Sequence, residues 1–287
     1  MELMYSENWE LSSGKKYCRV FSKAGDGKLM EDLIKLEFVD LAFAVGSMAM
    51  AIGLSAWENL GLELTIMTAA GRTILQLLVL GYILYFVFAL DNVWGVLAIL
   101  AVILIIAAMV ARNRISTKIP QVLPLVWGAI FISTALTVIY VNFLIIQPDR
   151  WYEPRYVIPL AGIVLGNAMN AAAIAGERLV SNMNSQPLEI ETHLSLGATP
   201  KQAVSKYRKE AIRAAFLPTL NQMMLVGMVA IPGITTGQLL AGITPLDAVA
   251  YEIVIIFMVA MANLLTTILV TRGLYRQFFN SAAQLVR

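Results

Sequence analysis

The chain has 287 residues, of which 59% are hydrophobic and 14% charged, and its formal net charge is +2. Soluble domains carry about 25% charged residues, so this low charge content and a mean hydropathy of +0.72 exclude an ordinary soluble protein. The single cysteine, Cys18, and the single histidine, His193, exclude an intrachain disulfide and a metal centre built from several Cys or His side chains.

Residues 1–35 are polar and mixed in sign, and they show no regular periodicity. No apolar core like that of a signal peptide follows the first residues, so we expect a disordered N-terminal tail. Met30 opens the compact stretch MEDLIKLEFVDLA just before the first apolar run, and we hypothesise that it is the true initiator. Residues 36–287 are expected to form a single transmembrane domain.

Long apolar runs fill the rest of the chain, and each meets or nearly meets the roughly 20 residues that a helix needs to cross a bilayer. In lipid the backbone must satisfy its own hydrogen bonds, and these runs lack the alternation of barrel strands. We therefore expect an all-α, polytopic membrane protein with about seven transmembrane helices. The expected spans are 41–57, 64–90, 93–111, 122–146, 157–176, 214–246 and 253–270.

Lys and Arg gather in three segments, which are the loop 112–121, the stretch 177–213 and the tail after Thr271. Because cytoplasmic loops are enriched in Lys and Arg, we expect these segments on the inner side of a cell inner (plasma) membrane. With seven spans, the C-terminus is then cytoplasmic and the N-terminus lies outside. The turn 58–63 opposes this topology, since it should be cytoplasmic but carries no Lys or Arg.

The basic stretch contains a pattern of two helices joined by a turn. Gly197 is expected to end a helix that begins near Leu188, because glycine readily adopts the left-handed conformation that follows a helix. Thr199 and Pro200 are expected to start the second helix as its N-cap and first residue. The apolar side chains of that helix fall on one stripe, which consists of Ala203, Val204, Tyr207, Ala211, Ile212, Ala215 and Phe216.

Three interpretations of this hairpin are open. It could rest its stripe on anionic lipid headgroups, read DNA as a helix-turn-helix does, or dock a cytoplasmic partner. Spans directly on either side argue against DNA. No stretch fits the G-x-x-x-x-G-K-[ST] phosphate loop, since GDGKL around Lys28 lacks the first glycine and the final hydroxyl residue. If the chain works with ATP, the ATPase must therefore be a separate polypeptide.

Several motifs resemble one family of membrane proteins. They are GRTILQLLVLGYIL, VIPLAGIVLGNAMNAAAIAGERL, LSLGATPKQA, IRAAFLPT, VGMVAIPGITTGQLLAGITPLDAVAY and FFNSAAQLV. In this order, over about residues 39–287, they resemble the FetB-type permeases of ABC transporters, which are linked to iron export. The resemblance implies a permease subunit that works as a homodimer with two copies of a cytoplasmic ATPase. Iron is the implied cargo, and plant relatives leave export of a UDP-glucose-like cargo as the alternative.

The resemblance also implies that the segment 177–216 couples the ATPase to the spans, and that ATP is used by the partner while this chain binds no cofactor. Gly197 and Pro218 are 21 positions apart, farther than in importer permeases, so the docking geometry of importers is not carried over. The residues expected to make the coupling contact are Glu191, Leu196, Gly197, Ala198, Thr199, Pro200, Leu217 and Pro218.

Polar residues inside spans are costly and suggest a translocation path. Arg72 and Gln76 lie one turn apart in the second expected span, and Arg72 either lines the path or snorkels towards the membrane surface. In the fifth expected span, Asn167 and Asn170 share a face, with Met169 beside it. These amides either line the path or hold helices together through hydrogen bonds.

The sixth expected span contains IPGITTGQ, whose proline and glycines favour a break in the helix. Broken helices line substrate paths in many transporters, and a plain kink is the alternative. The path residues expected here are Pro232, Gly233, Thr235, Thr236 and Gly237.

Four acidic residues, Asp40, Asp91, Asp247 and Glu252, fall at the outer ends of expected spans and are interpreted as a solvated rim. No acid then lies mid-span, which argues against a stand-alone channel or a proton-coupled carrier. An intramembrane enzyme is less favoured still, because no His, Cys or acid cluster offers a nucleophile or a metal site. The ligands of any metal stay unknown.

Overall fold

The computed structural model describes residues 38–90, 92–116, 119, 121–280 and 283–285. The expected tail 1–35 and the candidate initiator Met30 lie outside the described residues. Within the described part, helices form the whole architecture and no strand beyond isolated bridges is present. The helices are α2 Phe38–Trp57, α3 Glu63–Leu90, α4 Val93–Ile115, α5 Val122–Tyr140, η1 Val141–Ile146, α6 Pro154–Ser185, α7 Pro187–Ser195, α8 Pro200–Ala203, α9 Ser205–Leu225, α10 Gly233–Leu240, α11 Pro245–Leu274 and η2 Tyr275–Phe278.

Five of these described helices are long and apolar enough to cross a membrane, namely α3, α4, α5 with η1, α6, and α11 with η2. A sixth apolar helix, α2, has a shorter apolar stretch over Leu41–Trp57. The prediction of an all-α polytopic membrane protein is therefore confirmed. Six of the seven expected spans correspond to single helices, and the remaining one does not.

The exception is the expected span 214–246. Helix α9 ends at Leu225, an irregular segment covers residues 226–232, and α10 is only eight residues long. Gly227 adopts a positive φ of 80°, and Pro232 lies in extended conformation directly before α10. Because proline lacks a backbone donor and glycine permits the left-handed turn, the chain leaves the helix here. The predicted break is confirmed, and it is wider than a kink.

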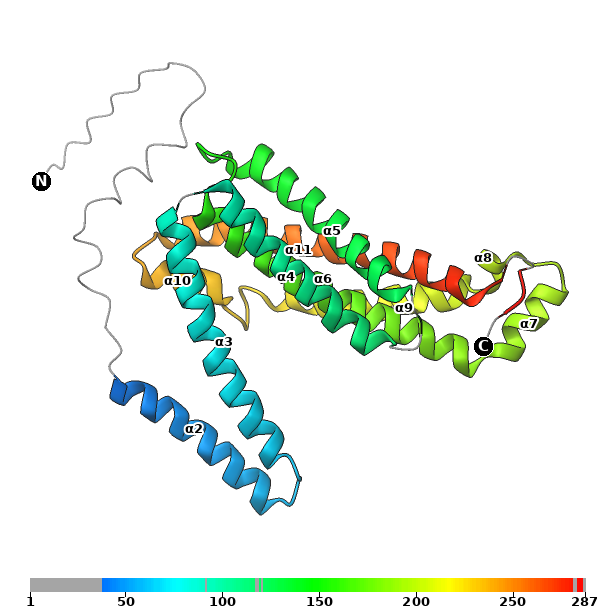
Figure 1. Cartoon of the computed structure of the whole chain (residues 1–287), viewed down its shortest axis with the longest axis horizontal. Helices are drawn as coiled ribbons and strands as arrows, with labels where there is room; N and C mark the ends of the chain where they lie inside the picture. The colour runs from blue at the N-terminus through cyan, green and yellow to red at the C-terminus, as the bar shows by residue number, and fades with distance from the viewer. Residues whose placement is uncertain (1–37, 91, 117–118, 120, 281–282, 286–287) are drawn as a thin grey trace, which may run out of the picture.

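Helices α4, α5, α6, α9 and α11 pack side by side along the long axis of the molecule (Figure 1), with α6 in contact with each of the other four. The hairpin of α2 and α3 diverges from this bundle (Figure 1). Only the end of α3 packs against it, where Val87 joins Val96, Val157 and Ile158 in a small buried cluster. The α3 side chains that precede this cluster are almost all exposed.

Helix α6 extends beyond a bilayer. Its 32 residues make it about 48 Å long at 1.5 Å per residue, whereas the hydrocarbon core is about 30 Å thick. The main buried cluster follows α6 along this length, from Leu165 through Leu179 to Met183, and includes Ile190 of α7 and Val204 before α9. A single core thus continues from the membrane-spanning bundle into the helical extension that carries α7 and α8.

Two glycines of α6, Gly162 and Gly166, face open space within this chain. A close approach occurs instead at Gly176, where an added Cβ would lie 2.5 Å from Ile115 Cδ1 at the end of α4. Ala168, between them, is fully buried.

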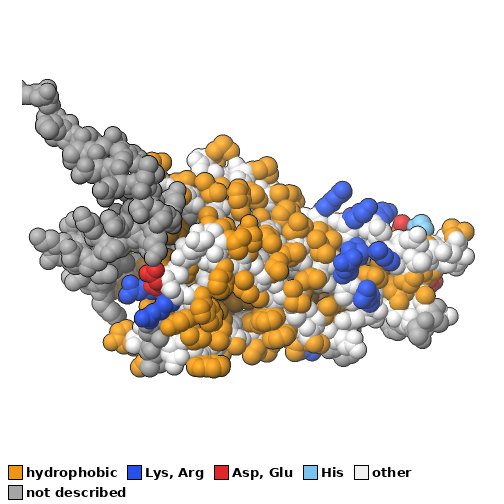
Figure 2. Space-filling model, turned by 90° about the horizontal axis from the view of Figure 1, so that it is seen from above, with side chains coloured by type: hydrophobic (Ala, Val, Ile, Leu, Met, Phe, Trp, Pro, Cys, Tyr) orange, Lys and Arg blue, Asp and Glu red, His pale blue; other side chains and the backbone are white. Residues whose placement is uncertain are grey.

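The three basic segments lie at the same end of the molecule. The amide of Gln277 in η2 donates to the Gln121 carbonyl (3.2 Å) before α5, and α7 and α8 lie at that end beside the C-terminus (Figure 1). Lys and Arg side chains accordingly gather beyond the apolar surface of the bundle (Figure 2). This common location was predicted.

Candidate functional site

The turn between α7 and α8 is closed by local hydrogen bonds at both ends. Gly197 has a φ of 87°, its N–H donates to Leu194 O (3.0 Å), and the N–H of Ala198 donates to His193 O (3.0 Å). This is the paired bond pattern of a glycine-terminated helix. Thr199 then caps α8 in a capping box with Gln202, and Pro200 occupies the first helical position. The predicted stop and start signals are confirmed.

The second helix of the hairpin differs from the prediction in one respect. It is interrupted at Val204 (φ −97°, ψ 3°), which separates the four-residue α8 from α9. Val204 is completely buried in the main core cluster together with Ala203 and Tyr207, so tertiary packing sets the interruption. The chain therefore turns here around a side chain held in the core.

The predicted apolar stripe is buried or half-buried along its whole length. It packs inside the protein, because α9 contacts both α6 and α11. Lys201, Lys206, Lys209 and Arg213 stay exposed on the other side. A stripe covered by the chain's own helices is not free to lie on lipid headgroups, so that interpretation is wrong.

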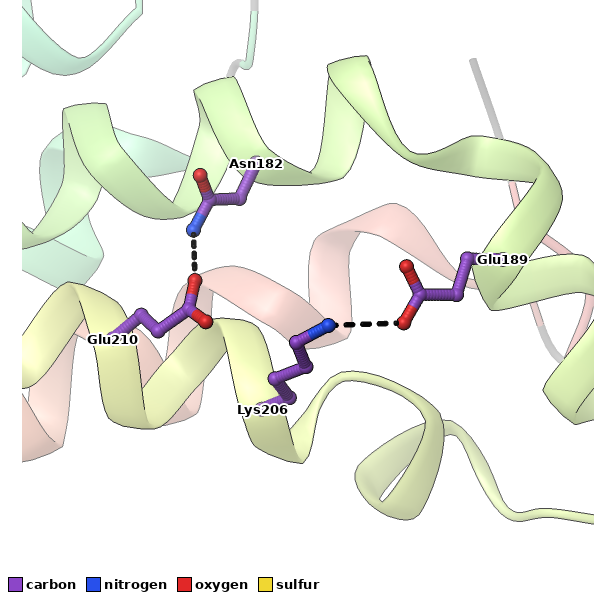
Figure 3. A network of polar contacts seen from close by, with 4 residues as sticks. All are labelled: Asn182, Glu189, Lys206 and Glu210. Carbon is purple, nitrogen blue, oxygen red and sulfur yellow. Dashed lines mark hydrogen bonds and ion pairs between the residues drawn. The ribbon is translucent and has the colours of Figure 1, made fainter.

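Polar contacts tie the hairpin to the bundle (Figure 3). Lys206 Nζ of α9 forms an ion pair with Glu189 Oε1 of α7 (3.3 Å), and Asn182 Nδ2 of α6 donates to Glu210 Oε2 of α9 (3.3 Å). The pKa of Glu189 is lowered, first by the adjacent Tyr207 hydroxyl and then by Lys206. The Tyr207 hydroxyl is buried and has no hydrogen-bond partner within bonding distance and angle among the described residues. Burial raises the pKa of Tyr207.

The end of this extension presents an exposed surface, which we call the tip and define as Leu188–Pro200. Leu196 is 80% exposed and Leu188 is 74% exposed, although Ile190 between them is fully buried. Glu191, Gly197 and Thr199 are also exposed. The tip is thus anchored from inside and carries apolar side chains outward.

Two residues expected to act with the tip lie elsewhere. Leu217 and Pro218 are in the interior of α9, where Pro218 is tolerated within the helix. Leu217 lies 12 residues after the start of α9, about 18 Å along its axis. Their part in the coupling contact stays a prediction, and both residues are exposed along α9 rather than within the tip.

A cavity of about 270 Å³ lies between α6, α9, α10 and α11, next to the broken helix. Asn167 of α6 and the predicted Pro232 and Gly233 line it. The remaining lining side chains come from all four helices and are mostly apolar: Ile163, Thr219, Gln222, Met223, Ile234, Glu252, Ile255, Ile256 and Val259.

Glu252 is the carboxylate of this cavity, and its expected place on a solvated rim is wrong. It is 6% exposed, and its Oε2 accepts a hydrogen bond from Thr235 Oγ1 of α10 (2.9 Å). The expected last span began at residue 253, but α11 begins at Pro245, so Glu252 lies two turns inside the helix. Asp247 is exposed and bonds Thr244 at the start of α11 (2.6 Å), whereas the Asp40 side chain and Asp91 lie outside the described part.

The cavity is supported by a further bond between its walls. Asn263 Nδ2 of α11 donates to Thr219 Oγ1 of α9 (2.8 Å), and both residues are buried. Asn167 Nδ2 donates to Ile163 O within α6 (2.9 Å), which leaves Asn167 Oδ1 without a donor among described residues. The walls are therefore held by polar contacts that engage Thr219 Oγ1 and leave Asn167 Oδ1 free.

The other predicted path residues do not meet in this cavity. Arg72 and Gln76 are exposed on α3, away from the bundle, and neither has a hydrogen-bond partner among described residues. Asn170 accepts a bond from Arg114 of α4 (3.2 Å), so it holds two helices together. Met169 packs against the main core, and Thr236 and Gly237 are exposed.

Sequence reasoning missed four polar residues at or behind the cavity, namely Thr219, Gln222, Glu252 and Asn263. Thr219 and Gln222 fall in the uncharged run 214–246, which resembles an ordinary transmembrane helix. For Glu252 a signal existed: Thr244 caps α11 and Pro245 occupies its first turn, so the T-P pair marks the helix start eight residues earlier than the uncharged run does.

Comparison with known proteins identifies the family. An uncharacterised protein family, UPF0014, matches residues 38–279. The chain belongs to the UPF0014 family. No solved structure matches it.

Curated relatives cover most of this UPF0014 chain. A UPF0014 membrane protein of Synechocystis sp. is 50% identical over 254 residues, which is 88% of this chain and 98% of the relative. The Escherichia coli (strain K12) protein named "Probable iron export permease protein FetB" is 37% identical, over 86% of this chain and 93% of the relative. The Arabidopsis thaliana protein ALUMINUM SENSITIVE 3 is 33% identical, over 85% of this chain and 88% of the relative. The predicted resemblance to FetB-type permeases is confirmed, and this UPF0014 protein is a multi-pass membrane permease.

Proposed function

We propose that this UPF0014 chain is the permease subunit of an ATP-binding cassette exporter for iron or another metal ion, driven by a separate cytoplasmic ATPase. The tip is the observation that carries this proposal. It is capped at both ends, anchored by Ile190, and presented on a helical extension whose core is continuous with that of the membrane bundle. Such an element suits a partner that binds the tip and moves the bundle through it.

The proposal includes further partners and a location. A homodimer of the permease works with two ATPase subunits in the inner (plasma) membrane, with the C-terminus cytoplasmic and the N-terminus outside. ATP binds to the partner, and this chain binds no cofactor. The cluster of Lys and Arg at the end that carries the tip supports this orientation, because basic residues favour the cytoplasmic side.

The cavity favours a metal ion over a nucleotide sugar as cargo. Its lining includes one carboxylate and no Lys or Arg, so it offers no counter-charge for the phosphates of a UDP-glucose-like molecule. The name of the E. coli relative, a probable iron export permease, also favours a metal ion as cargo. We therefore keep the nucleotide sugar only as the alternative cargo.

A proton-coupled carrier is the second candidate function, because Glu252 supplies the buried intramembrane acid that such a carrier requires. Transport assays in vesicles that contain the purified complex distinguish the ATP-driven exporter from the proton-coupled carrier. We expect Fe²⁺ to move when ATP is supplied on the side of the tip, with no need for a proton gradient. Movement driven by a proton gradient without ATP would overturn the ATP-driven mechanism.

The tip itself is tested by Gly197→Val. A β-branched residue at a φ of 87° costs about 1–2 kcal/mol and distorts the turn. We expect the tagged chain, purified from membranes of its own host, to lose most of its associated ATP hydrolysis while it stays inserted in the membrane.

Gly61→Val is the matched control for this variant. Gly61 has a similar positive φ of 68° and open space around it, but it lies in the turn between α2 and α3, far from the tip (Figure 1). We expect Gly61→Val to keep the associated ATPase. Equal ATP hydrolysis in both variants would remove the tip from the mechanism.

A further inference from the structure

Glu252 is the ionisable side chain that lines the cavity between α6, α9, α10 and α11. The other lining residues are neutral, and no Lys, Arg or His is among them. A carboxylate that is 94% buried in a membrane protein is costly unless it is paired or protonated, because the surroundings solvate its charge poorly.

The hydrogen bonding of Glu252 is incomplete. Thr235 Oγ1 donates to Oε2, but Oε1 accepts no hydrogen bond from any described residue. One donor does not satisfy an ionised carboxylate, which has about four acceptor positions on its two oxygens. The free oxygen is therefore available to a proton, a water molecule or a cation.

Side chains with neutral oxygens share the lining of this cavity with the carboxylate. Asn167 of α6 keeps its Oδ1 free, while Thr219 and Gln222 of α9 add a hydroxyl and a carboxamide from the facing wall. Oxygen donors of this kind, with one carboxylate, are the ligands that hard divalent cations take in proteins. Three helices thus direct oxygen ligands to one cavity.

We infer that this cavity is a transit site for a hard or borderline divalent cation, such as Mn²⁺ or Fe²⁺, with Glu252 as its charged ligand. The inference rests on the proposed export function and specifies the substrate class and the residues that hold it. No group of three or more His, Cys, Asp or Glu residues occurs in the described part of the chain, so this ion has one carboxylate and otherwise neutral donors. A site with a single charged ligand suits an exporter, because the cation must leave the site as well as enter it.

The size of the cavity agrees with a small ion. Pockets for drug-sized organic ligands measure about 300–1,000 Å³, and this cavity of about 270 Å³ lies just below that range. It accommodates a cation with part of its hydration shell, while the phosphates of a nucleotide sugar would meet the Glu252 carboxylate.

The first test measures binding of Mn²⁺ to the purified permease in detergent, without ATPase, by electron paramagnetic resonance. We expect Glu252→Gln to lower the affinity roughly tenfold or more, since even indirect partners of a metal site change affinity by 10–100-fold. Glu58→Gln is the matched control, because it makes the same change at an exposed acid in the turn after α2. Unchanged Mn²⁺ affinity in folded Glu252→Gln would overturn the inference.

The second test uses the unmodified chain and so does not depend on a variant that folds. Dicyclohexylcarbodiimide reacts with carboxyl groups in apolar surroundings, and mass spectrometry locates the product. We expect labelling at Glu252, with protection by Mn²⁺ and none by UDP-glucose. Labelling that Mn²⁺ leaves unchanged, or that UDP-glucose prevents, would overturn the inference.

These experiments separate the site from the proposed function. Mn²⁺ binding needs no ATPase, so a failure to bind would leave ATP-driven export standing with another cargo site. Binding without ATP-dependent transport in vesicles would instead overturn the exporter and keep the cation site.

Discussion

At the residue scale, Gly176 marks the closest approach of α6 to α4. A Cβ at this position would lie 2.5 Å from both Cδ1 and Cγ1 of Ile115, and 3.1 Å from Cγ2. Ile115 is buried in the main core cluster, so its side chain has little room to move away. The absence of a side chain at residue 176 is thus a packing requirement.

We predict that Gly176→Ala destabilises the chain even though alanine favours helix more than glycine does. Overpacking a core costs about 1–3 kcal/mol, which exceeds the gain of up to about 1 kcal/mol in helix propensity. The measurement is the thermal unfolding midpoint in detergent, followed by tryptophan fluorescence.

Gly166→Ala, in the same helix, is the control for Gly176→Ala. A Cβ at Gly166 would meet nothing within 4 Å, so we expect an equal or higher midpoint there. A midpoint for Gly176→Ala at or above that of Gly166→Ala would show that Ile115 relaxes and that the packing is loose.

At the element scale, the caps of the hairpin were predictable because they depend on neighbouring residues alone. Gly197, Thr199 and Pro200 act through the backbone within one turn, and the structure places each where sequence reasoning expected it. The interruption at Val204 and the burial of Glu252 were not predictable in this way, although Thr244 and Pro245 mark Glu252 as a residue inside α11. Val204 interrupts a helix because core packing holds it, and Glu252 is buried because a cavity forms between α6, α9, α10 and α11.

The capping box of α8 gives a testable prediction at this scale. Loss of an N-cap side chain costs about 1 kcal/mol, so we expect Thr199→Ala to speed amide hydrogen exchange in Lys201–Ala203 roughly fivefold. Thr192→Ala is the control, because that hydroxyl bonds Leu188 O inside α7 (2.7 Å) and caps nothing. Equal exchange in the two variants would mean that Pro200 and the core hold α8 without the cap.

At the scale of the whole molecule, the two ends of the bundle differ in charge and shape. One end carries the tip and the basic segments, and the other carries the connection between η1 and α6, where Trp151 is exposed. Because Lys and Arg favour the cytoplasmic side, this asymmetry predicts opposite exposure of Leu196 and Trp151 in cells.

Cysteine labelling tests this orientation. In a Cys18→Ser background, we expect Leu196→Cys to react with a membrane-impermeant maleimide only in inside-out vesicles, and Trp151→Cys to react only in intact cells whose surface is accessible. The reverse pattern would place the tip outside and exclude contact with a cytoplasmic ATPase. Both positions are exposed in this chain, so the inside-out vesicles are tested after the ATPase has been stripped from them.

Helix α6 reaches from the cavity to the base of the tip without a break. Asn167 lines the cavity and Ser185 ends the helix below the tip, about 27 Å away along the axis of α6. The helix is continuous over this stretch. We therefore expect a tilt imposed at the tip to move the wall of the cavity that Asn167 lines.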